Sequence, residues 1–364
     1  CDGWQDHERA VVVYEDFQLA GHTGDDFPEW GSSPRRPLVV FDMAHKGEWL
    51  DSVIGPDPLT GDPMIYHIVR CELCIAIHVW PLPSAAALTH YYMTTFYQQD
   101  KPEYLERTAR DRIWWESCVW RPLLQQCLDA VHEPVRPLSA PFRLLDIGCG
   151  PAVSLNVAAC MGMQTYGIEP NRAVADLAQQ RGHIVYAGTL EDSPFTTPGI
   201  FDLRQCFQII TAYEVLEHQV CPDDFLLRCY DLLEPGGVLM IEVPNDYSPI
   251  QLLAREQLHE KPWWLAPPQH LFHWSPKTLQ LCLRRAGFTI LDMRGTYPLD
   301  QALLQGQNYI GNDVVGRQVH TARMQWELDM LQKGKWSQVE AEYRANLYHR
   351  IGREIVCIAR KEAG

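Results

Sequence analysis

Short apolar runs and amphipathic stretches alternate along the second half of the chain, from Phe142 onward. The runs have the length of strands, and the stretches between them repeat apolar positions every three or four residues, as helices that cover a sheet do. This alternation predicts an α/β domain with a mostly parallel sheet and helices on both faces. We expect its strands, in chain order, at Leu144–Ile147, Gln164–Ile168, His183–Ala187, Gln208–Ala212, Val238–Val243, Phe288–Met293 and Glu354–Arg360.

The first part of the chain has a different pattern. Residues 1–36 are polar and rich in turn-forming residues, so we expect an irregular segment there. Residues 37–100 contain short β-like runs separated by glycine, proline and aspartate, which predicts a small, mostly β module. Residues 101–141 form an expected helical connector that Pro122 should kink or break, and its last part, 134–141, is a proline-rich linker.

The last two expected strands are separated by about fifty residues, where a short turn would be enough to join them. Residues 336–350 within this stretch have the apolar spacing of a helix. An insertion of this size at the ligand-facing end of a sheet predicts a helical lid over residues 297–350. The α/β domain as a whole should span residues 142–364.

The most informative stretch is Arg143–Ala152, where a buried strand runs into a turn containing Gly148 and Gly150 and then into a helix. Glycines at these positions let the backbone approach a ligand, and the amide groups that open the helix point toward it. The next strand ends in Glu169, whose carboxylate can accept hydrogen bonds from both hydroxyl groups of a ribose. The pattern predicts a nucleoside site. A dinucleotide cofactor is the alternative, although its fingerprint has a third glycine where this chain has Val153.

At these residues the chain resembles the class I S-adenosylmethionine-dependent methyltransferases, whose first motif has the form Asp-x-Gly-x-Gly. The Glu217-His218 pair after the fourth strand and the stretch from Glu234 to Asn245 are also similar to this family, in particular to the subgroup that contains the ubiquinone-biosynthesis O-methyltransferases. The resemblance implies a Rossmann-like seven-stranded sheet in which six strands are parallel and the last is antiparallel beside the sixth. It also implies donor contacts, with the adenine nearest residues 190 and 191, from Asp146, Gly148, Cys149, Gly150, Glu169, Pro170, Leu190, Glu191, Tyr213 and Glu214.

Three histidines are candidates for the general base that an oxygen or nitrogen acceptor requires, because histidine exchanges protons near neutral pH. His218 follows the fourth strand at the carboxyl edge of the sheet, and His270 and His273 lie in a loop beyond the fifth strand on the same edge. Structural roles are the alternative: His218 could orient the helix that follows, and His270 could fasten its loop. Glu214 and Glu217 could bind a hydroxyl group or a metal ion.

A candidate metal site lies in the β-rich module. Cys71 and Cys74 form a Cys-x-x-Cys pair at the tip of an expected hairpin, and His67 and His78 flank it. Zinc accepts such ligands, but a full zinc ribbon would supply a second Cys-x-x-Cys pair. The alternative is a degenerate ribbon that holds its hairpin by packing alone. The module loosely resembles the ribbon-like modules that precede some methyltransferase domains, those of sugar C-methyltransferases among them.

Composition narrows the range of partners. The formal net charge of −15 would repel a nucleic acid backbone, and no basic run offsets it. No apolar run has the length needed to span a bilayer. Most cysteines, such as Cys118, Cys160 and Cys357, lie in apolar sequence surroundings, which favours reduced thiols and a cytoplasmic location. We therefore expect a small-molecule acceptor as the partner, and neither nucleic acid nor a membrane.

Together these features predict an enzyme that transfers a methyl group from S-adenosylmethionine to a small molecule. O-methylation is favoured by the subgroup, and sugar C-methylation is its rival because of the ribbon-like module. A donor-binding but inactive subunit that regulates or scaffolds a partner is an alternative of another class, and a dehydrogenase is the remaining one. The expected cofactors are S-adenosylmethionine and, at the hairpin, zinc.

Overall fold

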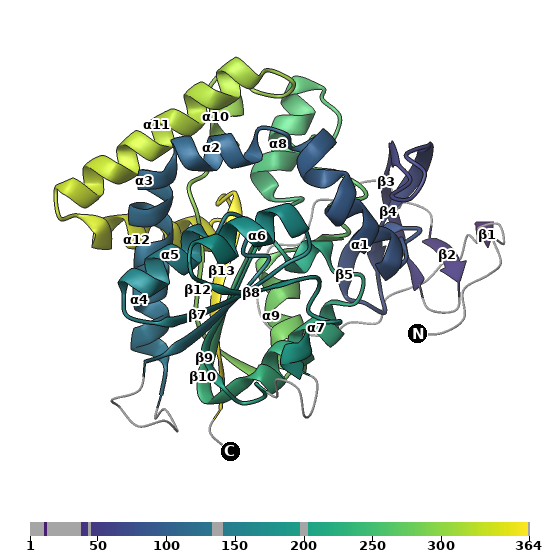
Figure 1. Cartoon of the computed structure of the whole chain (residues 1–364). Helices are drawn as coiled ribbons and strands as arrows, with labels where there is room; N and C mark the ends of the chain where they lie inside the picture. The colour runs from purple at the N-terminus through teal and green to yellow at the C-terminus, as the bar shows by residue number, and fades with distance from the viewer. Residues whose placement is uncertain (1–10, 13–37, 43–44, 133–140, 197–202, 363–364) are drawn as a thin grey trace, which may run out of the picture.

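The structure is a computed structural model, and it describes residues 11–12, 38–42, 45–132, 141–196 and 203–362. The expected irregular segment 1–36, apart from residues 11–12, and the expected linker 134–141, apart from residue 141, lie outside these ranges. Within them the chain forms two β-sheets with helices packed around the larger sheet (Figure 1).

The larger sheet has the seven strands expected from the apolar runs. Neighbouring strands from β10 to β8 are parallel, and β13 is antiparallel to both of its neighbours. The expectation of six parallel strands and one antiparallel strand is confirmed. In spatial order the strands are β12 (Phe288–Gly295), β13 (Glu354–Lys361), β10 (Leu233–Pro244), β9 (Phe207–Tyr213), β6 (Arg143–Ile147), β7 (Gln164–Glu169) and β8 (Ile184–Ala187).

Helices cover both faces of this sheet, because successive side chains of a strand point to opposite faces. Ile209 and Ile210, neighbours in β9, accordingly belong to two different apolar clusters. The cluster around Ile210 is covered by α7 (Pro222–Leu232) and α9 (Pro276–Arg285). The cluster around Ile209 is covered by α4 (Arg121–Ala130), α5 (Val153–Cys160) and α6 (Arg172–Gln180).

Several helices begin where the sequence signals place them. The side chain of Asn171 accepts a hydrogen bond from the amide of Val174 and caps α6. Pro222 opens α7, where its missing N–H leaves no hydrogen bond unmade. Ser275 caps α9 through a reciprocal pair of hydrogen bonds with Thr278.

Two elements differ from the prediction. The strand expected to begin at Val238 begins at Leu233, and its register against β9 shifts between these two residues. The connector helix is interrupted well before Pro122, which lies in the first turn of α4, where proline is tolerated. Its segments are α2 (Tyr104–Arg110), α3 (Arg112–Trp114), a π-helical segment (Trp115–Trp120) and α4.

The smaller sheet, which we call the front sheet, combines the β-rich module with a strand from the larger domain. Its strands, in spatial order, are β1 (Val11–Val12), β2 (Leu38–Asp42), β3 (His45–Pro56), β4 (Pro63–Cys71), β5 (Ala76–Trp80) and β11 (Phe272–His273). The long strand β3 was not expected. After β5 the chain forms α1 (Ala85–Thr94) and a π-helical segment (Phe96–Asp100), so the end of the module is helical.

The insertion before β13 contains α10 (Gln301–Leu304), α11 (Asp313–Gln332) and α12 (Trp336–Tyr348). The helix expected at 336–350 is α12, and it packs on the edge strand β12. In Figure 1, α11 lies beside α2 and α3, and Arg317 in α11 forms an ion pair with Asp111 there. The remaining helical elements are α8 (Pro249–Leu258) and short 3₁₀ turns at Pro194–Thr196 and Leu216–His218. None of the helices described here combines the length and the apolar character that crossing a bilayer requires.

Candidate active site

The glycine turn after β6 has the conformation that its sequence predicts. Gly148 and Gly150 have φ values of +73° and +47°. A Cβ atom on Gly148 would lie 2.7 Å from Cγ2 of Val215, so a side chain at that position would also clash. The amides of Gly148 and Cys149 donate to the carbonyl of Ile168 at 2.8 and 3.1 Å, which folds the turn back over the end of β7.

Glu169, the last residue of β7, lies directly against this turn. One carboxylate oxygen accepts a hydrogen bond from the amide of Gly150 at 3.0 Å, and the other accepts one from the amide of Asn171 at 2.8 Å. Burial raises the pKa of Glu169 to about 7, although both amides favour the charged form. Hydroxyl groups that donate to this carboxylate would add to that stabilisation, as the hydroxyls of a ribose would.

Asp146 lies under the turn, in β6. Its carboxylate accepts hydrogen bonds from the hydroxyl groups of Ser154 and Thr211, the second at 2.6 Å. Burial raises the pKa of Asp146 to about 6. Two neighbouring carboxylates, Asp146 and Glu169, thus make this end of the sheet suited to a ligand with a positive charge.

Aromatic residues that follow β5 lie close to the expected donor residues. The hydroxyl group of Tyr97 lies 3.5 Å from a carboxylate oxygen of Glu169 and 3.7 Å from the Cβ position of Gly150. Asn171 donates to the carbonyl of Met93, which ties the same segment to the start of α6. Burial raises the pKa of Tyr104, and the negative charges of Glu214, Glu169 and Asp146 raise it further. Tyr104 therefore lies within electrostatic range of carboxylates in β6, at the end of β7 and just after β9.

The other expected donor contacts have varied surroundings. Leu190 is a buried core residue, whereas Glu191 beside it is exposed. Cys149 is buried in the turn, and Pro170 is half-buried after Glu169. Tyr213 ends β9 and packs against Trp115 and Trp120, with ring centroids 5.8 and 5.2 Å away.

Glu214, just after β9, belongs to a second group of candidate site residues, which also contains Glu217, His218 and His270. It has a φ of +53°, which is rare for a residue with a side chain, and its amide donates to the carbonyl of Glu242 at 3.0 Å. Its side chain can be reached by solvent, yet the surrounding protein and the charge of Glu354 raise the pKa of its carboxyl group. Backbone strain of this kind is concentrated at functional sites.

Glu217, His218 and His270 form a cluster beside it, in which one ligand atom from each residue lies within 4.8 Å of the others. His218 donates from Nδ1 to the carbonyl of Gln269 at 2.6 Å, so its Nε2 carries a lone pair. Burial lowers the pKa of His218 to about 4 and that of His270 to about 3, which leaves both rings neutral near pH 7.

The carboxylate of Glu217 is fully buried, and within the described ranges neither of its oxygens has a hydrogen-bond partner. Burial raises its pKa well above the usual range. A buried carboxylate without partners is costly unless a proton or a cation neutralises it. Together with two neutral imidazole rings, it offers the ligand types that a divalent metal ion accepts.

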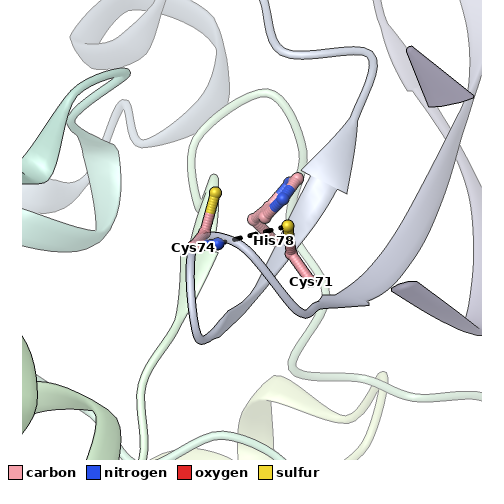
Figure 2. Close-up of side chains that lie close together, drawn as sticks. All are labelled: Cys71, Cys74 and His78. Carbon is pink, nitrogen blue, oxygen red and sulfur yellow. Dashed lines mark hydrogen bonds between the residues drawn. The ribbon is translucent and has the colours of Figure 1, made fainter. Parts of the chain in front are cut away.

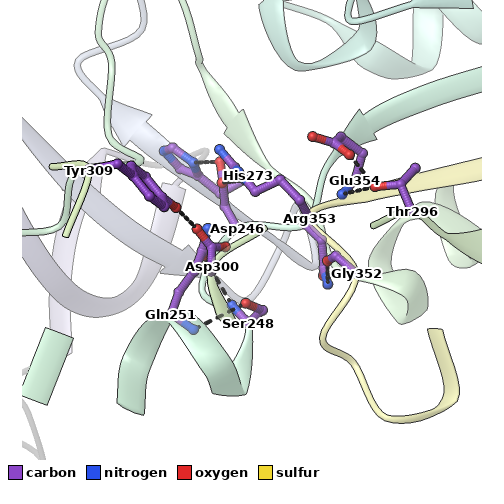
Figure 3. A network of polar contacts seen from close by, with 11 residues as sticks. Asp246, Ser248, Gln251, His273, Thr296, Asp300, Tyr309, Gly352, Arg353 and Glu354 are labelled. Carbon is purple, nitrogen blue, oxygen red and sulfur yellow. Dashed lines mark hydrogen bonds and ion pairs between the residues drawn. The ribbon is translucent and has the colours of Figure 1, made fainter. Parts of the chain in front are cut away.

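His273 lies in different surroundings from the other two candidate bases. It is buried in β11 and its Nδ1 bonds Asp246 at 2.9 Å, while Arg353 contacts the other oxygen of Asp246 at 3.1 Å (Figure 3). Hydrogen bonding to His273 and the charge of Arg353 outweigh burial and hold the pKa of Asp246 at about 2. Asp300 and Tyr309 of the insertion bond each other in the same network (Figure 3).

Three of these residues, Tyr97, Asp246 and Arg353, were not among the predicted site residues. Asp246 lies just beyond β10, and position alone could have indicated it because ligand-binding residues follow strand ends. Arg353 precedes β13, whose antiparallel direction brings its first residues to the same edge. Tyr97 lies far from the sheet in sequence, and no local signal marks it.

The predicted metal ligands of the hairpin do not all meet. Cys71, Cys74 and His78 have ligand atoms within 4.8 Å of one another, and Figure 2 shows the three side chains gathered at the turn between β4 and β5. His67 is not part of this cluster: its Nδ1 bonds the hydroxyl group of Ser52 at 2.8 Å.

The known proteins that this chain matches include methyltransferases in each comparison. A family model described as a methyltransferase domain matches residues 115–292. Over 215 residues the chain is 28% identical to a ubiquinone biosynthesis O-methyltransferase of Roseobacter denitrificans, an alignment that covers 54% of this chain and 85% of that protein. With the protein of that name from Nitrobacter winogradskyi it shares 37% identity over 109 residues, or 29% of this chain and 40% of the relative.

The coverage differs among these relatives, and the chain spans less than half the length of several of them. Among solved structures, a SAM-dependent methyltransferase from Archaeoglobus fulgidus is 16% identical, with a TM-score of 0.44 and coverage of 71% of this chain and 99% of that one.

Proposed function

We propose that this chain is a class I S-adenosylmethionine-dependent methyltransferase that transfers the methyl group to a hydroxyl oxygen of a small-molecule acceptor. The oxygen is proposed because the relatives reported above are named O-methyltransferases. One observation carries the proposal for the site: the parallel strands β6, β7 and β9 bring the proposed donor residues and the cluster of Glu217, His218 and His270 to the same carboxyl edge of the sheet.

On the donor side, Glu169 would bind the ribose hydroxyls, and Asp146 with the Gly148–Gly150 turn would surround the ribose and the methionine part. The two carboxylates would balance the positive charge of the sulfonium. Cys149, Pro170, Leu190, Glu191 and Tyr213 remain proposed contacts of the same ligand. Tyr97 would cover the donor, because its hydroxyl group already lies beside Glu169.

Methyl transfer from a sulfonium is an in-line displacement that needs close positioning and the exclusion of water more than covalent help. The carbon–sulfur bond breaks as the oxygen–carbon bond forms, and S-adenosylhomocysteine leaves with the electron pair. A hydroxyl acceptor must also lose its proton. Nε2 of His218 carries a lone pair at neutral pH and can accept that proton, and His270 lies beside it, with the ring centroids 5.2 Å apart.

The cluster of Glu217, His218 and His270 could hold a divalent cation in the same place. Such an ion would lower the pKa of an acceptor hydroxyl that it binds. The buried carboxylate without a hydrogen-bond partner in the described part of the chain fits this ligand set. A metal ion at Cys71, Cys74 and His78 would instead have a structural role. Zinc sites with thiolate ligands and no open coordination position typically stabilise the fold.

The experiment is a measurement of S-adenosylhomocysteine release with a methyl-labelled donor and three sets of acceptors: phenols and catechols, small amines, and nucleotide-linked deoxysugars. O-methylation predicts labelled ethers from the first set only. Label on a sugar carbon would establish the rival C-methylation. Tight donor binding without release in any set would instead support an inactive donor-binding subunit.

A further inference from the structure

The turn between β4 and β5 brings three metal-ligating side chains to one side of the front sheet. β4 and β5 are antiparallel, with Val69 opposite His78 and Cys71 opposite Ala76. Side chains two residues apart on a strand share a face, and paired residues share it across strands. Cys71 and His78 therefore lie on one face, and the turn places Cys74 beside them (Figure 2).

The hydrogen bonds around these residues prepare them to bind a cation. His78 donates from Nδ1 to the carbonyl of Val79 at 2.8 Å, which fixes the ring and leaves Nε2 with its lone pair. The amide of Cys74 donates to Sγ of Cys71 at 3.4 Å, the dashed line in Figure 2, which holds the two cysteines of the turn close together.

We propose that Cys71, Cys74 and His78 bind a zinc ion that holds the β4–β5 hairpin in place and thereby supports β11, the strand next to His270. Two thiolates and one imidazole suit zinc rather than magnesium or calcium, which prefer oxygen ligands. Zinc takes four ligands, so a further ligand, which need not be protein, completes the set.

The link to the active site runs through β11. Phe272 and His273 pair with His78 and Ile77 of β5, and the amide of Val79 donates to the carbonyl of Leu271 at 2.9 Å. The ring of Phe272 packs on that of His78, with centroids 5.4 Å apart. An ion on His78 would therefore hold the strand that orders the loop, two residues from His270.

Metal content of the full chain tests the site without reference to activity. The protein is stripped of metal, reloaded with zinc and desalted. We expect about one equivalent of thiolate-bound zinc per chain, lost in Cys74→Ser and kept in Cys160→Ser, a change at an exposed cysteine of α5. Wild-type protein that retains no zinc, or a Cys74→Ser variant that retains as much, would overturn the proposal.

Cobalt substitution separates this site from the cluster of Glu217, His218 and His270. Cobalt bound by two thiolates gives an intense sulfur-to-metal absorption that oxygen and nitrogen ligands cannot give. We expect this band in the wild type and in His218→Ala, and its loss in Cys74→Ser. Cobalt bound without the band, or a band lost in His218→Ala, would place the metal elsewhere and refute the assignment.

Hydrogen exchange tests the coupling to the loop. Removal of zinc should increase amide exchange in β5 and in residues 269–274, while the central strand β9 stays protected. In Cys74→Ser the same segments should exchange quickly with or without zinc. Equal exchange of residues 269–274 in zinc-loaded and stripped wild type would disprove the coupling. Because donor binding is not measured, failure here leaves the proposed methyl transfer unaffected.

Discussion

The substitution Glu169→Gln separates a binding role from a structural role. It should weaken donor binding, yet it should raise the stability of the protein relative to wild type as the pH increases. The neutral amide keeps the shape of the side chain but loses the charge that would accept hydrogen bonds from the ribose hydroxyls. Hydrogen bonds to a charged group contribute about 1.5–3 kcal/mol each, so the loss of two should weaken donor binding by at least about 3 kcal/mol, more than a hundredfold.

The stability of the variant relative to wild type should instead increase as the pH rises. The pKa of Glu169 is raised from 4.5 to about 7 in the folded chain. Between these values the folded state holds a proton that the unfolded state has lost, so the carboxyl group makes folding less favourable as pH increases, until the effect is complete above pH 7. At 1.36 kcal/mol per pH unit this amounts to about 3 kcal/mol. The glutamine variant lacks this pH dependence.

The variant also places an NH₂ group near the amide of Gly150 or Asn171, so that one of these amides loses its acceptor. This should lower the free energy of unfolding by about 1–3 kcal/mol at any pH. The informative quantity is therefore the stability of the variant relative to wild type at two pH values. From about pH 5 to about pH 8 it should rise by about 2–3 kcal/mol, as measured by denaturant unfolding.

Donor affinity is measured by calorimetry with S-adenosylhomocysteine, which binds without turnover. The control is Glu256→Gln, a change at an exposed carboxylate of α8, which should alter neither quantity. Unchanged affinity in Glu169→Gln would remove this residue from the donor site. A relative stability that is the same at both pH values would show that Glu169 is not a buried carboxylate with a raised pKa.

Three further predictions follow from the geometry. Gly148→Ala should weaken donor binding at least about tenfold, because the new Cβ would meet Val215 at 2.7 Å and the φ is +73°; wild-type affinity in calorimetry would contradict this. His218→Ala and His270→Ala should each lower kcat at saturating donor about tenfold or more. Because both rings are already neutral, the wild-type kcat should show no loss between about pH 8 and about pH 5.5 that depends on these histidines. A loss of kcat centred near pH 6.5 that the wild type shows and both alanine variants lack would refute that assignment. Asp246→Asn should lower the free energy of unfolding by about 2 kcal/mol near neutral pH, with the difference disappearing as pH falls from 3.8 to about 2; an equally stable variant in denaturant unfolding would contradict this.

The α/β domain could be predicted from the sequence because its strands are continuous apolar runs. The central part of β13, residues 355–359, is buried and contains no polar side chain to obscure its pattern. Helix α11 lies within the helical lid expected at 297–350, but its position there could not be predicted, for the opposite reason. Its buried side includes Arg323 and Glu327, which pair at 3.0 Å, so its apolar period is broken by charges that only the folded chain brings into contact. The exposed, partly polar strand β3 likewise has no clear alternation.

The candidate site could be predicted where local sequence determines geometry. The glycine turn and Glu169 belong to two adjacent strand ends, and their meeting follows from the parallel pairing of β6 and β7. The contact of Tyr97 with Glu169 joins residues 72 positions apart, and that of Arg353 with Asp246 joins residues 107 positions apart. Such contacts depend on how separate segments pack against one another. The periodicity of apolar residues does not predict that packing. Cys160 illustrates the same limit: its neighbours are apolar, yet it is exposed at the end of α5.

The charges around the second group of site residues favour a neutral or cationic ligand there. Burial and neighbouring carboxylates raise the pKa of Glu214, Glu217 and Glu242 together, whereas Arg353 is already engaged by Asp246. An anionic acceptor would add to the repulsion that already raises the pKa of these carboxyl groups. A neutral hydroxyl compound would not, and a divalent cation would let them ionise. The acceptor should accordingly lack a carboxylate or phosphate near the oxygen that receives the methyl group, and in a panel of matched phenols an adjacent anionic group should reduce kcat/KM.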